Sequence, residues 1–136
     1  MIELEKMRIH HIGYLVKNIV KSKDLFLKMG YRLSKDNTYD KFRDVDICFL
    51  EKDGYCIELV SPRTTDSVVG ELRKKLGNTP YHICYEVDDL EDVISELGKQ
   101  RFVIWEEPHE APAIEGRRVA FLVNSQIGMI ELLESK

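Results

Sequence analysis

Two short stretches of the chain alternate apolar and other residues and spell almost the same strand. HHIGYLV covers residues 10–16, and YHICYEV covers residues 81–87. When His11 is aligned with His82, the residue types His, Ile, Tyr and Val coincide in both stretches. Alternation with a period of two indicates a half-buried β-strand. The chain is therefore expected to use one strand design twice.

Apolar residues at helical spacing follow each of these strands. In residues 88–98 they are Leu90, Val93, Ile94 and Leu97, with Asp88 or Asp89 as the N-cap and Gly98 as the stop. Residues 18–30 follow the same plan less regularly, beginning at Asn18 and ending at Gly30. A further strand is expected after each helix, at residues 31–34 and 102–107.

Each copy is expected to close with a β-hairpin. Asp53-Gly54 between two apolar runs is a strong hairpin signal, and a second turn is expected near Asn124–Gly128. The predicted fold class is α+β: two tandem βαβββ modules that form a curved mixed sheet around a cavity, with the helices outside. In this single domain, module one covers about residues 8–62, a connecting segment with a helix about 63–79, and module two about 80–136.

Composition narrows the class of protein. A chain of 136 residues is one domain's worth, and its net charge of -4 provides no basic surface for nucleic acid. No apolar run is long enough to span a membrane, and the N-terminus lacks a signal-peptide pattern. Cys48, Cys56 and Cys84 lie in expected strands without a C-x-x-C pair, which favours reduced thiols and a cytoplasmic location.

The alternation of the strands directs two histidines and two glutamates toward the predicted cavity. Taken singly, a histidine in a strand is more often structural, and a glutamate can be an edge residue or an ion-pair partner. Burying two carboxylates together would cost several kcal/mol, and a divalent cation removes that cost. The predicted metal ligands are His11, Glu58, His82 and Glu131, a set that suits Zn, Ni, Co, Mn or Fe(II).

Other polar residues are weaker candidates. The parity of His10 places it with the residues that pack under the helix, so a structural role is expected. His109 falls in an expected surface loop, where a substrate contact is the less favoured alternative. Arg117 and Arg118 either meet an anionic part of a substrate or are solvated charges that begin a strand.

The stretches HHIGYLV, YHICYEVDDLEDVISEL and RRVAFL…IELLE resemble the vicinal oxygen chelate superfamily, which includes glyoxalases, bleomycin resistance proteins and dioxygenases. Two of its families are similar across essentially the whole chain: lactoylglutathione lyase (glyoxalase I) and methylmalonyl-CoA epimerase. Glu58 resembles the ligand set of bacterial glyoxalase I, because the epimerases usually have glutamine there. The segment from Glu106 to Glu134 is more similar to the epimerases, and the DPDG turn of glyoxalase I is missing.

The resemblance implies a metal-dependent enzyme of the glyoxalase I type, which transfers a proton next to a carbonyl through a metal-bound enediolate. An epimerase of methylmalonyl-CoA is the alternative, and a metal-free binding or resistance protein of the same fold is a further one. An Fe(II) dioxygenase is disfavoured, because no additional inward histidine is apparent. Glu131, or Glu58 by the internal repeat, is the candidate base. The implied partners are one divalent ion (Ni, Zn, Co or Mn), a thiol hemithioacetal or acyl-CoA substrate, and a second copy in a homodimer.

Overall fold

The computed structural model describes residues 4–136, which form two compact units. The N-terminal unit comprises His11–Tyr81, and the C-terminal unit comprises residues 4–10 together with His82–Lys136. In chain order the elements are η1 (Leu4–Lys6), β1 (Arg8–Leu15), α1 (Ile19–Lys28), β2 (Arg32–Asp40), β3 (Val45–Lys52), β4 (Tyr55–Pro62), α2 (Gly70–Leu76), β5 (Thr79–Val87), α3 (Leu90–Gly98), β6 (Val103–Ala111), η2 (Pro112–Ile114), β7 (Arg117–Asn124) and β8 (Gly128–Glu134).

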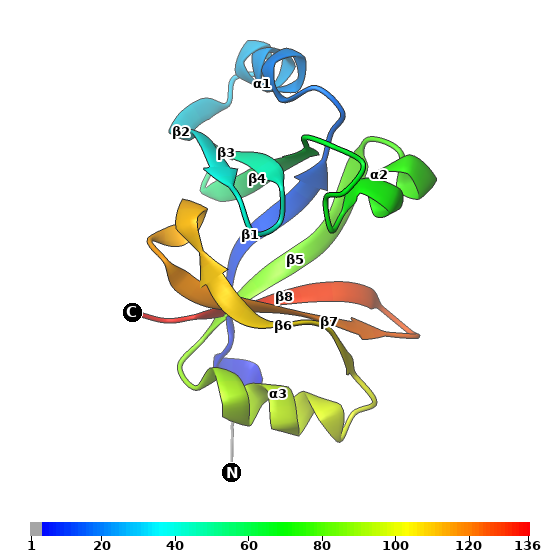
Figure 1. The fold of residues 1–136 in the computed structure, drawn as a ribbon. Helices are drawn as coiled ribbons and strands as arrows, with labels where there is room; N and C mark the ends of the chain where they lie inside the picture. Colours follow the sequence, from blue (N-terminus) through cyan, green and yellow to red (C-terminus); the bar gives the residue numbers. More distant parts are fainter. Residues whose placement is uncertain (1–3) are drawn as a thin grey trace. The chain divides into compact units, whose positions relative to one another are not determined.

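Both units have the same strand order and the same pairing directions (Figure 1). In the N-terminal unit the order is β2-β3-β4-β1, with β1 parallel to β4 and the other neighbours antiparallel. In the C-terminal unit the order is β5-β8-β7-β6, with β5 parallel to β8 and the other neighbours antiparallel. The predicted pair of mixed βαβββ modules in an α+β fold is therefore confirmed.

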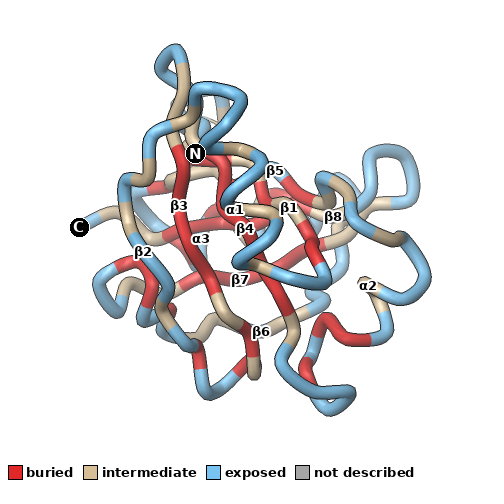
Figure 2. The backbone as a smooth tube through the Cα atoms, turned by 90° about the horizontal axis from the view of Figure 1, so that it is seen from above, coloured by how far each residue is buried: buried red, intermediate tan, exposed pale blue. Residues whose placement is uncertain are grey.

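Each unit packs its own helix against its own sheet. In the N-terminal unit, Ile19 and Phe26 of α1 pack on a cluster from β3 and β4 that includes Leu50 and Leu59. In the C-terminal unit, α3 packs on Ile130 and Leu132 of β8 and on neighbouring residues of β7. Figure 2 shows that many of the buried residues lie along β3, β4 and β7. Burying these apolar side chains is the main favourable contribution to the folding of each unit.

Local sequence signals set the ends of these elements. The Asn18 side chain accepts a hydrogen bond from the Lys21 backbone N–H, and the Asp89 side chain accepts one from Asp92, so both predicted N-caps are present. Asp53 and Gly54 both have positive φ, 53° and 84°, as a two-residue type I′ hairpin requires. Of the described helices, none is both long and apolar enough to cross a lipid bilayer.

The structure corrects several details of the sequence-based expectations. Strands β2 and β6 run on to Asp40 and Ala111, so His109 lies in a strand and not in a loop. Both are terminal strands of their sheets, where polar residues and proline are tolerated because one edge makes no ladder hydrogen bonds. The alternation of residues 81–87 places Ile83 on the face that packs under a helix, but Ile83 is 38% exposed, and Met29, the C-cap of α1, is also exposed.

A buried ion pair closes the loop between β2 and β3. The Arg43 guanidinium donates to the Asp40 carboxylate at 2.7 Å, and Asp40 also accepts the backbone N–H of Arg43 at 3.0 Å. Both residues are buried. Removing one partner of such a pair leaves the other charge uncompensated in a region of low dielectric constant.

We therefore expect Asp40→Asn to lower the free energy of unfolding by about 3–5 kcal/mol, measured by urea denaturation. The matched control is Glu96→Gln, which removes the partner of Lys99 in an exposed pair with the same three-residue spacing. That change is expected to have a much smaller effect. If both variants lose the same free energy of unfolding, then burial does not increase the contribution of the Asp40–Arg43 pair to stability.

Candidate metal and catalytic site

In the N-terminal unit, two neighbouring parallel strands bring together an imidazole and a carboxylate. His11 lies on β1 and Glu58 on β4, where Glu58 is paired with Gly13 in the β1–β4 register. The His11 Nε2 atom is 3.2 Å from the Glu58 Oε1 atom. The two residues are only 1% and 4% exposed. The period-two alternation of strands β1 and β4 thus places both side chains where the sequence predicted them, on one side of the unit's sheet.

The C-terminal unit repeats this arrangement. His82 lies on β5 and Glu131 on β8, where Glu131 is paired with Cys84 in the β5–β8 register. The His82 Nε2 atom is 3.0 Å from the Glu131 Oε1 atom, and the residues are 4% and 3% exposed. The same pair of residue types therefore occurs at corresponding places in the two units.

A phenylalanine supports each pair, and sequence analysis did not assign it to the site. The Phe49 ring contacts the His11 ring edge-on, with centroids 5.5 Å apart, and Phe121 contacts His82 in the same way at 5.2 Å. Phe49 is paired with Glu58 across β3 and β4, and Phe121 with Glu131 across β7 and β8. The available sequence signal for these rings was that Phe49 and Phe121 each begin a Phe-Leu dipeptide at corresponding places of the internal repeat. These rings limit the orientations open to the imidazoles.

The chemistry of each pair fits a divalent cation. Two donor atoms about 2.1 Å from one ion and at right angles are about 3 Å apart, as the nitrogen and oxygen of each pair are. Imidazole and carboxylate are ligands that Zn, Ni, Co and Mn accept. Burying a carboxylate without a counter-charge is unfavourable, and a divalent cation bound beside it would supply that charge.

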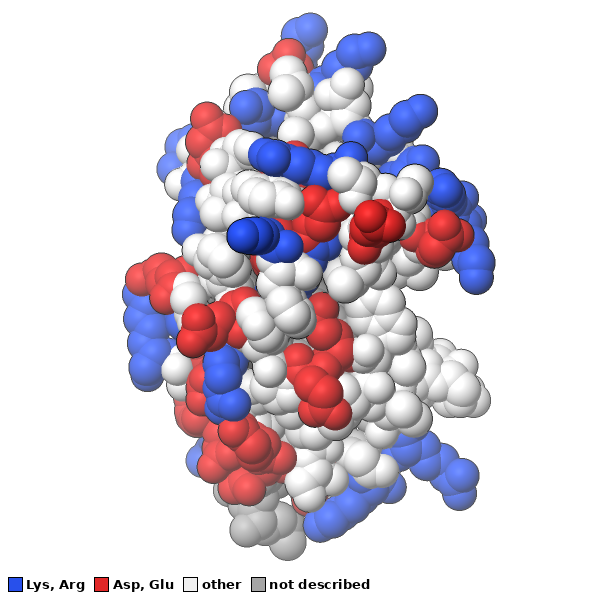
Figure 3. Space-filling model, in the orientation of Figure 1, with Lys and Arg blue, Asp and Glu red and all other residues white. Residues whose placement is uncertain are grey.

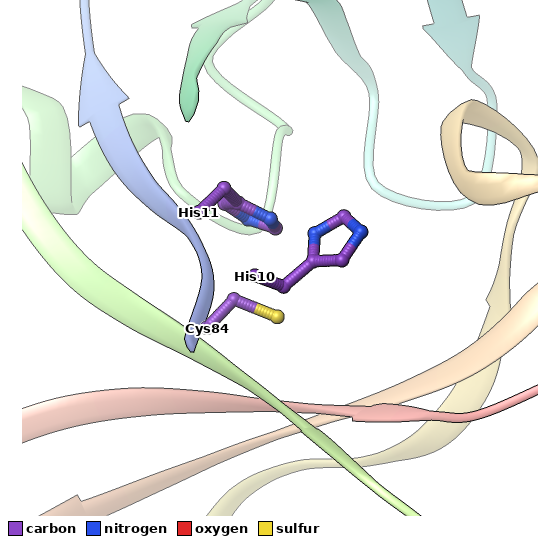
Figure 4. Close-up of side chains that lie close together, drawn as sticks. All are labelled: His10, His11 and Cys84. Atoms are coloured by element: carbon purple, nitrogen blue, oxygen red, sulfur yellow. The ribbon is translucent and has the colours of Figure 1, made fainter. Parts of the chain in front are cut away.

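A second group of possible ligands consists of His10, His11 and Cys84. One donor atom from each of the three lies within 4.8 Å of the others, and Figure 4 shows the three side chains close together. His10 is half-buried, whereas Cys84 is fully buried. By strand alternation, His10 is expected to point with the residues that pack under the helix, in a structural role. For this reason we treat this group as the less favoured ligand set.

Arg117 is committed to contacts within the C-terminal unit. Its guanidinium donates to the Glu86 carboxylate and to the Glu134 carbonyl oxygen. Burial raises the pKa of Glu86, but hydrogen bonds from Arg117 and Arg8 outweigh burial and hold that pKa below its ordinary value. Arg118 pairs with the Glu134 carboxylate at 2.9 Å. Both arginines begin β7, as one of the two alternatives expected, but Arg117 is largely buried and both are held in ion pairs within their unit.

Two of the three thiols lie in surroundings that disfavour the reactive thiolate form. Burial raises the pKa of Cys48 and of Cys56 to about 11, so both are protonated at neutral pH. The described part of the chain contains all three cysteines and no disulfide. The expectation of reduced thiols fits this arrangement.

Comparison with known proteins agrees with the fold. A model of the Glyoxalase/Bleomycin resistance protein/Dioxygenase superfamily matches residues 10–121, and the chain belongs to this superfamily. A hypothetical protein from Bacillus halodurans C-125 has a similar structure, with a TM-score of 0.84, 26% identity and coverage of 96% of both chains.

Two epimerases are also similar in structure. Methylmalonyl-CoA epimerase from Mycobacterium tuberculosis has a TM-score of 0.84 and 20% identity, over 100% of this chain and 93% of that one. Methylmalonyl-CoA epimerase from Streptomyces coelicolor, in complex with 2-nitronate-propionyl-CoA, has a TM-score of 0.78 and 20% identity, over 94% and 96% of the chains. None of the curated proteins compared with this chain matches it.

Proposed function

We propose that this protein is a metal-dependent enzyme that transfers a proton at the carbon next to the carbonyl of an acyl-CoA thioester, as an epimerase does. The observation that carries the proposal is the buried His–Glu pair that occurs once in each unit. The structural similarity to methylmalonyl-CoA epimerases supports the choice of substrate class. At 20% identity this similarity concerns the fold, so the reaction is inferred from the residues.

In this proposal the two pairs are halves of one site, and His11, Glu58, His82 and Glu131 hold one divalent ion (Ni, Zn, Co or Mn). Two carboxylates and one doubly charged ion balance in charge, which relieves the cost of burying the carboxylates. A bound divalent ion would supply a Lewis acid that polarises the carbonyl oxygen of the substrate. The imidazoles contribute neutral nitrogen donors and fix the position of the site.

The chain's own carboxylates would move the proton. Glu131 accepts the proton from the α-carbon, so that the C–H bond breaks and an O–H bond forms on the carboxylate. Inversion requires a proton to arrive on the opposite face of that carbon. Glu58, the corresponding residue of the other unit, is the candidate donor: it first takes up a proton from solvent, and its O–H bond then breaks as the new C–H bond forms on that face. The two residues exchange roles in the reverse reaction.

A second candidate is a lactoylglutathione lyase type of activity, in which the proton is returned to the neighbouring carbon of a thiol hemithioacetal. The specific observation that favours it is the carboxylate at Glu58, where the sequence resembles the ligand set of bacterial glyoxalase I. Both reactions use the same first step, so one base serves either proposal.

One experiment separates the two candidates. The protein is loaded in turn with Zn, Ni, Co and Mn in D₂O, and the α-proton signal of methylmalonyl-CoA is followed by NMR. We expect that signal to disappear only with metal-loaded protein, and the hemithioacetals of methylglyoxal with several thiols to remain unchanged. Isomerisation of a hemithioacetal instead would establish the second candidate. Failure of all substrates with every metal, with tight binding of an antibiotic to metal-free protein, would contradict both.

A further inference from the structure

A basic pocket lies in the N-terminal unit, at the ends of the two strands that carry His11 and Glu58. It has a volume of about 240 Å³ and is lined by Lys17, Pro62, Arg63, Thr64, Thr65, Gly70, Arg73 and Lys74. Four of these residues are cationic, and no Asp or Glu of the described chain lines the pocket. Figure 3 shows blue Lys and Arg side chains along the outer edge of α2, with red Asp and Glu side chains beside them, and α2 contributes part of the lining.

The segment that forms one wall is held in place from behind. The Arg63 guanidinium makes two hydrogen bonds of 3.0 Å with the Asp46 carboxylate and stacks on the Tyr39 ring at 3.8 Å. The Asp44 carboxylate accepts hydrogen bonds from the hydroxyl and the backbone N–H of Thr64. The pocket is thus partly preorganised, with little conformational entropy left to lose at this wall.

On the other side, two of the three cations, Arg73 and Lys17, have no carboxylate partner among the described residues. The Arg73 guanidinium donates to the neutral amide oxygen of Asn78 at 3.3 Å. Lys74 has an exposed partner, Glu71, at 3.6 Å. Like charges that converge on one hollow repel each other, and an anion bound there would relieve that repulsion.

We propose that this pocket binds a phosphate or diphosphate group. Guanidinium groups match the geometry of phosphate oxygens with paired N–H donors, and lysine adds a compact positive charge. Thr65, which also lines the pocket, carries a hydroxyl that adds a neutral hydrogen-bond donor. The volume accommodates several water molecules, and so a diphosphate.

The place of the pocket in the fold relates it to the candidate metal site, and this step rests on the proposed function. Lys17 follows His11 by six residues and Pro62 follows Glu58 by four, along strands that run parallel. At about 3.3 Å per strand residue, these separations are about 13–20 Å. An acyl-CoA substrate has its reactive thioester and its phosphates at opposite ends of a long flexible arm. The pocket therefore fits the phosphate groups of such a carrier.

Binding to the pocket is tested without reference to turnover, by calorimetric titration of the metal-loaded protein with ADP, inorganic phosphate and, as the uncharged control, adenosine. The double variant Lys17→Gln, Arg73→Gln is expected to weaken ADP binding at least about tenfold, which corresponds to about 1.4 kcal/mol. The control Lys75→Gln changes an exposed lysine of α2 that does not line the pocket, and it is expected to leave ADP binding unchanged. Thermal unfolding confirms that the variants are folded. Absence of ADP and phosphate binding, or equal affinities of all variants, would overturn the proposal.

The source of the phosphate is tested with two thioesters of methylmalonate, one with CoA and one with N-acetylcysteamine, which lacks phosphates. If the pocket holds the carrier, the double variant raises KM for the CoA ester only. If ADP binding is lost while both KM values stay unchanged, the pocket binds a free phosphate compound and the assignment to the carrier is wrong. If neither ester reacts with any variant, the proposed function fails, and the ADP titration still decides whether the pocket is an anion site.

Discussion

Replacing Glu131 by glutamine is expected to lower turnover by about 10²–10⁴-fold, the usual contribution of a positioned general base, while metal stays bound. The amide keeps an oxygen in place of the carboxylate oxygen that lies 3.0 Å from His82, but the neutral amide does not accept the α-proton. The measurement is proton exchange at the α-carbon in D₂O, together with the metal content of the same sample.

Two further variants make this prediction specific. Glu107→Gln removes an exposed charge on β6 and is expected to leave exchange unchanged. Glu58→Gln tests the corresponding residue of the other unit, and loss of inversion with retained exchange would identify it as the second proton-transfer group. Turnover of the Glu131 variant within a few-fold of the parent enzyme would show that Glu131 is not the base.

Replacing His11 by alanine is expected to abolish stoichiometric metal binding. Loss of a hydrogen-bond partner of a metal ligand typically costs 10–100-fold in affinity, and loss of the ligand itself is expected to exceed about 100-fold. Metal content after gel filtration, measured by inductively coupled plasma mass spectrometry, should fall from about one ion per chain to nearly none.

The neighbouring histidine is the matched control. His10 precedes His11 on the same strand, and its side chain lies by Cys84 (Figure 4). His10→Ala is expected to keep the metal. If His10→Ala also loses the metal, the ligand set would instead be His10, His11 and Cys84.

The sequence predicted the two modules and the two His–Glu pairs for one physical reason. Side chains alternate between the faces of a strand, so the position of His11 fixes its direction once the strand is recognised. The internal repeat supplied an independent copy, which made His82 and Glu131 stand out from single histidines and glutamates. The parallel pairing of β1 with β4, and of β5 with β8, then brought each pair within hydrogen-bonding distance.

Other features of the structure could not be predicted from the sequence patterns, because they depend on residues that are distant along the chain. The polar end of β2 and the segment around Pro108 in β6 have the composition of loops, yet they pair as terminal strands. The roles of Arg117 and Arg118 depend on carboxylates from β5 and β8. The basic pocket combines Lys17 with residues between positions 62 and 74, so no single segment of the sequence indicates it. The homodimer and the cytoplasmic location stay predictions.

The central claim, that His11, Glu58, His82 and Glu131 hold one divalent ion, is tested most directly by anomalous X-ray diffraction at the absorption edge of the bound metal. We expect one strong anomalous peak per chain, in contact with the imidazole nitrogens of His11 and His82 and with carboxylate oxygens of Glu58 and Glu131. No peak after incubation with Zn, Ni, Co or Mn, or a peak bound by His10, His11 and Cys84 instead, would contradict this expectation.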